Sequence, residues 1–132
     1  MGDSVLLAVS PGTRERLEAA LAGHTLVGVE TLDQARAELG RRRFDLVIIG
    51  ARFEESTSFD MLRLVTAASP GSRVVCLRGV IPRSVLGKSS VDAFRIACEA
   101  LGAALVLDLL DYPRDDTGDA ALRATLEHEL VP

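Results

Sequence analysis

The strongest constraint on the fold is an alternation, repeated five times, of short apolar runs with longer stretches of helical period. The apolar runs have the length of strands and cover residues 4–9, 25–30, 45–50, 73–78 and 103–110. The stretches after them place apolar side chains every three or four residues and span 13–23, 31–43, 58–69, 90–101 and 117–130. Alternation of this kind predicts a parallel sheet with helices on both faces.

The apolar runs also predict the order of the strands. All of them except 25–30 are almost continuously apolar, which is typical of strands buried on both faces. Gly28 weakens the run 25–30 and favours a place nearer the edge of the sheet. With short, right-handed connections, the commonest order for five strands is 2-1-3-4-5. We therefore predict a three-layer, doubly wound (βα)5 α/β fold of the flavodoxin-like type, with residues 1–132 as a single domain.

Composition excludes several classes of protein. The net charge of −4 argues against a nucleic-acid-binding domain, which is usually basic. No apolar run approaches the roughly 18 residues of a membrane span, and the N-terminus lacks the features of a secretory signal. Cys76 and Cys98 are too few for a disulfide framework and lie in apolar runs, so we interpret them as small buried hydrophobic residues. We expect a cytoplasmic protein that associates with neither nucleic acid nor membrane.

Two stretches resemble the receiver domains of response regulators (the CheY-like family), a flavodoxin-like signalling module that accepts phosphate on an aspartate. "FDLVIIG" (44–50) is similar to the third strand of that family, and "ALGAALVLDLL" (100–110) to its turn into the fifth strand. The resemblance extends over nearly the whole chain. It implies a crevice with an attacking carboxylate, an acidic pair that helps to hold Mg²⁺, a Ser or Thr, and a Lys.

The sequence departs from that pattern at every one of these positions. The acceptor position falls on Gly50, the acidic pair on Val9 and Ser10, the hydroxyl on Arg78 and the lysine on Leu109. A slip of one residue moves the acidic pair to Ser10 and Pro11 without supplying an acid. The sequence therefore predicts a pseudo-receiver that is not an enzyme and has no catalytic residue, metal site or cofactor.

Arg78 replaces a small hydroxyl residue beside the position that has lost its carboxylate. One hypothesis is that it fills part of the vacated space and pairs with Glu54, Glu55 or Asp108, which would fix one conformation without phosphate. The alternative is that Arg78 points into water. The same three acids are the candidates for a residual Mg²⁺ site.

The segment 79–90 is longer than the usual connection of the resembling family. Its "LGKSS" (86–90) echoes the end of a P-loop, but Pro82 stands where a P-loop needs glycine, so a helix cap at Ser89 or Ser90 is the better interpretation. The segment also carries four apolar residues: Val80, Ile81, Val85 and Leu86. Clustered apolar residues on a surface loop indicate docking. The other possibility is that they fold back over the ends of the fourth and fifth strands.

The predicted helix 90–101 is more apolar than one sheet contact requires. Its principal apolar face consists of Val91, Phe94, Cys98 and Leu101, and the face is widened by Ala93, Ile96, Ala97 and Ala100. A helix that covers a sheet needs only one apolar stripe. The surplus predicts burial against a partner or beneath the 79–90 segment. The resemblance implies that this helix, the strand 103–110 and the helix 117–130 form a dimer and effector surface.

The sequence leaves two functions from different classes open. The first is phosphorylation-independent protein–protein interaction in a signalling system, with a homodimer as one arrangement. The second is binding of a small molecule or nucleotide in the emptied crevice, where Gly50 would let a ligand approach the backbone. Catalysis is disfavoured because no nucleophile and base have usable spacing.

Overall fold

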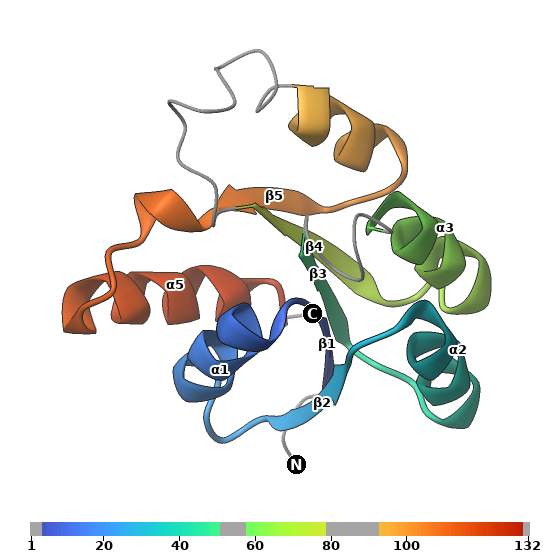
Figure 1. Cartoon of the computed structure of the whole chain (residues 1–132), viewed down its shortest axis with the longest axis horizontal. Helices are drawn as coiled ribbons and strands as arrows, with labels where there is room; N and C mark the ends of the chain where they lie inside the picture. The colour runs from blue at the N-terminus through green and yellow to red at the C-terminus, as the bar shows by residue number, and fades with distance from the viewer. Residues whose placement is uncertain (1–3, 51–57, 79–92, 131–132) are drawn as a thin grey trace.

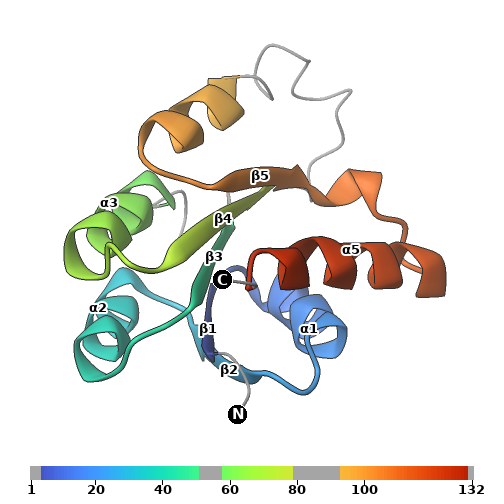
Figure 2. The same cartoon turned by 180° about the vertical axis from the view of Figure 1, so that it is seen from behind.

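A computed structural model describes residues 4–50, 58–78 and 93–130 and shows one parallel sheet between two layers of helices (Figures 1 and 2). The sheet has five strands in the order β2-β1-β3-β4-β5. Their bounds are Thr25–Val29 for β2, Ser4–Ala8 for β1, Leu46–Gly50 for β3, Arg73–Arg78 for β4 and Leu105–Asp108 for β5. The predicted fold class and strand order are confirmed.

Helices cover both faces of the sheet and enclose two apolar clusters. One face carries α1 (Pro11–Ala20) and α5 (Asp116–His128), and the other carries α2 (Leu32–Arg41), α3 (Ser58–Ala68) and a helix over 93–100 (Figure 2). Side chains alternate between the faces along each strand, so β3 sends Val47 and Ile49 to one cluster and Leu46 and Ile48 to the other.

Helix boundaries differ from the sequence predictions at two points. Helix α1 begins at Pro11 instead of residue 13, because proline is favoured in the first turn, where its missing N–H is not needed. Helix α5 is capped by Asp115, whose Oδ1 accepts a hydrogen bond from the Gly118 N–H at 2.7 Å. The helix therefore begins at Asp116, one residue before the predicted range.

The fifth strand is shorter and less buried than predicted. Only Leu105–Asp108 is extended, and Leu109–Asp111 forms a 3-10 turn, η2. Three of the four strand residues are half-buried because β5 is an edge strand, whereas β3 is buried throughout. In the described parts of the chain, no helix is long and apolar enough to cross a bilayer.

Candidate functional site

The candidate site lies at the edge of the sheet where β1, β3, β4 and β5 end. Ala8 pairs with Ile49, Gly50 with Leu77, and Arg78 with Asp108. Because parallel strands end at the same edge, this register brings together the positions singled out in the sequence. Ser10 lies there too, at the start of α1, where its Oγ donates to Thr13 Oγ1 at 3.2 Å.

Val9 fills the space beside Gly50. A Cβ atom added to Gly50 would lie 3.3 Å from Val9 Cγ1, a close contact, and 3.4 Å from Val9 Cα, which is near ordinary van der Waals contact. Val9 is buried and belongs to the cluster beneath α1 and α5. Gly50 therefore packs closely against an apolar neighbour, and a larger side chain at this position would require Val9 to shift by a few tenths of an ångström.

This packing corrects the hypothesis that Arg78 occupies that space. Leu77 lies opposite Gly50 and contributes to the same cluster as Val9. Side chains alternate along β4, so Arg78 projects from the other face of the sheet. The sequence does show a bulky residue at position 9 and a glycine at position 50. It does not show that the two are neighbours, because that depends on how the strands pair.

Arg78 is buried and paired across β4 and β5. Its Nη1 lies 3.6 Å from Asp108 Oδ2, and the two side chains are only 8% and 7% exposed. Asp108 Oδ1 also accepts a hydrogen bond from the Leu110 N–H at 2.9 Å. The predicted pairing with Asp108 is confirmed, and the alternative that Arg78 points into water is wrong. Glu54 and Glu55 lie outside the described residues.

The guanidinium of Arg78 is only partly satisfied. Among the described residues, neither Nη1 nor Nη2 has a hydrogen-bond acceptor. A buried ion pair without good hydrogen bonds contributes little net stability, yet losing one partner would strand the other charge in the interior. The pair therefore favours one arrangement of the β4 and β5 ends.

The remaining position is apolar. Leu109 stands where the resembling family has its lysine, and it is buried in the cluster with Val9. Within residues 4–50, 58–78 and 93–130, no three His, Cys, Asp or Glu side chains are grouped to hold a metal ion. What the described part of this edge provides is apolar packing and one ion pair.

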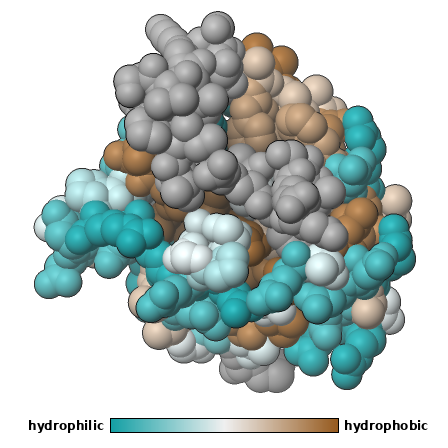
Figure 3. Space-filling view, viewed as in Figure 1, coloured by the Kyte–Doolittle hydropathy of each residue, from teal (hydrophilic) through white to brown (hydrophobic). Residues whose placement is uncertain are grey.

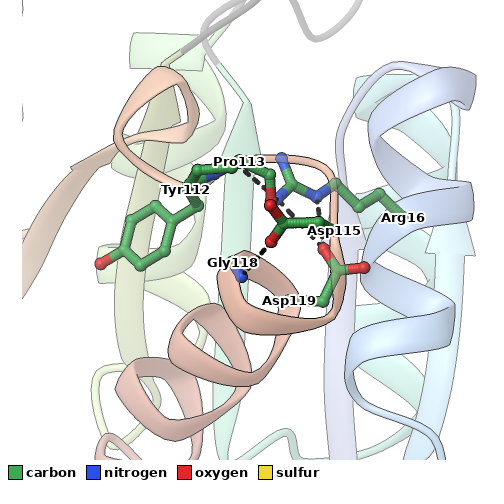
Figure 4. A network of polar contacts seen from close by, with 6 residues as sticks. All are labelled: Arg16, Tyr112, Pro113, Asp115, Gly118 and Asp119. Atoms are coloured by element: carbon green, nitrogen blue, oxygen red, sulfur yellow. Dashed lines mark hydrogen bonds and ion pairs between the residues drawn. The ribbon is translucent and has the colours of Figure 1, made fainter.

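Arg16 contributes a network that the sequence did not reveal (Figure 4). Its Nη2 donates to the carbonyl oxygens of Tyr112 and Pro113 at 2.7 and 3.0 Å, and its Nε donates to Asp119 Oδ1 at 3.1 Å. These bonds tie the connection between β5 and α5 to α1. The partners lie about a hundred positions away in the sequence, so no local pattern could identify them.

The helix 93–100 exposes the apolar stripe predicted for it. Ala93, Ile96 and Ala100 are all exposed, Ile96 to 68%. Inside, Phe94 packs on Phe59 with ring centroids 5.9 Å apart. Figure 3 shows apolar surface at its upper right, where the helix 93–100 lies in the same view in Figure 1. The other predicted interface residues, Val80, Ile81, Val85 and Leu86, lie outside the described residues.

No protein-family model and no curated protein matches the chain. Solved structures do match, and each of the three described next covers 98% of this chain. A response regulator from Thermotoga maritima has a TM-score of 0.73 at 18% identity, with 98% of that chain covered. The receiver domain of a sensor histidine kinase from Pseudomonas aeruginosa, with magnesium in its active-site cleft, has a TM-score of 0.70 at 21% identity, also with 98% covered. A signal receiver domain of an HD domain-containing protein from Pseudomonas fluorescens scores 0.73 at 22% identity, with 87% covered. The chain therefore has the receiver fold.

Proposed function

We propose that this protein is a pseudo-receiver, a single receiver-like domain that does not accept phosphate and acts through protein–protein contact. The observation that carries the proposal is the packing of Val9 against Gly50. A receiver needs a carboxylate at this point, and here Gly50 has no side chain and packs against an apolar neighbour. The buried Arg78–Asp108 pair supports a conformation that is set without phosphate.

The contact surface we propose is the face made by helix 93–100, β5 and α5, and its occupant is a second copy of the chain. Ile96 is largely exposed at the middle of the helix, and Leu110, in the turn η2 that follows β5, is 46% exposed. Arg95 and Glu99 flank Ile96 on the same helix and are exposed. With a two-fold axis beside Ile96 and the two helices antiparallel, Arg95 would face Glu99 of the partner subunit, and the contact would pair opposite charges.

The small-molecule alternative has weaker support. Val9 packs against Gly50, so the described surroundings of this glycine are apolar and offer no polar group to a ligand. A pocket of about 350 Å³ does open near the Arg16 network, but its lining includes Leu109, Tyr112 and Arg114 and neither Gly50 nor Val9. We therefore do not propose ligand binding as the function.

Sedimentation velocity over a concentration series tests the contact. The unmodified protein is expected to self-associate, and Ile96→Asp is expected to weaken association by about tenfold or more, since buried anchors at the centre of an interface contribute over 1 kcal/mol. Ala37→Asp adds the same charge to an exposed site on α2 and should have no effect.

A charge exchange sharpens the test. Arg95→Glu should weaken association, and Arg95→Glu combined with Glu99→Arg should restore it, because the two-fold contact pairs these residues. A strict monomer at every concentration, or equal association for all variants, would rule out this surface.

A further inference from the structure

Cys76 and Cys98 meet side by side in the core. They are the chain's two cysteines, one in β4 and one in the helix 93–100, and both side chains belong to the same apolar cluster. Their side chains are hydrogen-bonded to each other, each residue is 1% exposed, and both are free thiols. The prediction that both are small buried residues is confirmed, and the structure adds that they share one cluster.

The helix that carries Cys98 is lightly anchored. Cys98 is the single buried residue among 93–100, whereas α3 buries four of its eleven. Elements with few buried contacts open locally at lower cost than the rest of the fold. Cys98 can therefore meet a small reagent when this helix opens, while β4 stays in the sheet.

We propose that Cys76 and Cys98 are a modification site, a reversible disulfide that fastens the helix 93–100 to β4. The two side chains belong to one cluster and interact with each other, so closure requires the helix to approach the strand without unfolding of the sheet. In a reducing compartment such bonds are characteristically transient and redox-sensing instead of structural.

The environment distinguishes the two sulfurs. The hydrogen bond with Cys76 lowers the pKa of Cys98, while the same hydrogen bond, together with burial, raises the pKa of Cys76. Because the thiolate is the nucleophile, Cys98 reacts first and Cys76 resolves the product.

The oxidant is a low-molecular-weight disulfide of the glutathione class. Cys98 sulfur attacks one sulfur of that disulfide, the disulfide's own S–S bond breaks, and one small thiolate leaves. Cys76 sulfur then attacks Cys98 sulfur and expels the second small thiolate. The two protons lost by the cysteines end on the two small thiols, so the protein dithiol is oxidised and the small disulfide is reduced.

The consequence for binding rests on the proposed function. Ala93, Ile96 and Ala100 are on the outer side of the helix that the disulfide would fasten. Oxidation would hold this stripe in one position and reduction would release it. The modification itself does not depend on that role.

Oxidised glutathione added to the purified protein tests the site. Intact mass should fall by two hydrogen atoms, titratable thiols should fall from two to none per chain, and dithiothreitol should reverse both changes. Trypsin should then release the peptide 74–78 linked to the peptide 96–114. Cys98→Ala should form no internal disulfide, and Cys76→Ala should stop at a glutathione adduct on Cys98.

Other outcomes overturn the proposal. These are two thiols that persist in the native protein but react after unfolding, stable glutathione adducts on the unmodified chain, or disulfides between two chains. Sedimentation of the oxidised and reduced forms separates this proposal from the previous one. If the internal disulfide forms but neither form associates, the proposed contact surface fails and the modification site stands.

Discussion

Gly50 packs against Val9 at the position that the proposed function assigns to the acceptor of a receiver. A glycine ends a fully buried strand, and the neighbouring strand supplies the bulk. The pair explains why restoring one acidic residue would not restore the chemistry. The carboxylate would enter an apolar cluster in which Leu109 stands where a receiver has its lysine.

Gly50→Asp is therefore expected to destabilise the protein by about 2–4 kcal/mol, because a charge is buried without partners and Val9 must move. Urea unfolding measures the change. Gly12→Asp is the matched control, since a Cβ there meets nothing and an acid in the first turn of α1 is favourable. Adding Val9→Ala to Gly50→Asp should recover part of the loss. Equal stability of Gly50→Asp and the unmodified protein would contradict this packing.

Arg78 has a different role at the residue scale. Arg78→Ala should cost about 3 kcal/mol, because Asp108 would be left charged and buried. Arg78→Met together with Asp108→Asn should cost less than that, since the asparagine oxygen still accepts from the Leu110 N–H. A loss below about 0.5 kcal/mol for Arg78→Ala, measured by urea unfolding, would mean that the pair has no structural role.

At the scale of elements, Arg16 holds the connection between β5 and α5 against α1. Arg16→Ala should cost about 2 kcal/mol, because it removes a charged donor from two carbonyl groups and a carboxylate. Arg36→Ala is the control, since that arginine makes only an exposed pair with Asp33 and should change stability by less than about 0.5 kcal/mol. If Arg16→Ala and Arg36→Ala changed the free energy of unfolding equally, the Arg16 network would not stabilise the fold.

The end of α5 is held by a pH-dependent contact. Glu127 Oε2 lies 2.9 Å from His24 Nε2, and Glu127 Oε1 accepts from Arg123 Nε at 3.1 Å. The hydrogen bond from His24, followed by that from Arg123, lowers the pKa of Glu127 below its ordinary value of 4.5.

A carboxyl group whose pKa is lower in the folded state stabilises the fold above its ordinary pKa, and this contribution disappears as the pH falls through the lowered value. Glu127→Gln should therefore lose stability at neutral pH and lose less on acidification than the unmodified protein. Urea midpoints from about pH 7 to 3 measure both slopes. Parallel slopes would show that Glu127 is not linked to folding.

The elements themselves were largely predictable, since continuous apolar runs and helical periods are local signals. β3 and β4 match their predicted ranges closely, and the strand order followed from short right-handed connections. The range predicted for β5 was too long, because an apolar sequence does not reveal that the strand ends at Asp108 and that Leu109 begins the turn η2. The Arg16 network and the Val9–Gly50 packing were missed because both join residues distant in sequence, where only the register of the folded sheet sets the contact.

At the scale of the whole molecule, the chain has the receiver fold, and the proposed function holds that other side chains fill the positions of its chemistry. The described edge of the sheet combines apolar packing at Gly50 with an ion pair at Arg78, and the exposed stripe lies on the helix 93–100. A fold of this kind supports contact with a partner without a covalent switch on aspartate.

Intact mass after incubation with acetyl phosphate and Mg²⁺ tests the central claim most directly. A phosphorylatable receiver treated in parallel confirms that the donor is active. We predict no change in the mass of this protein, because no described residue at the sheet edge offers an acceptor carboxylate with a metal and a lysine beside it. A stable gain of one phosphoryl group, abolished by omitting Mg²⁺, would contradict the account.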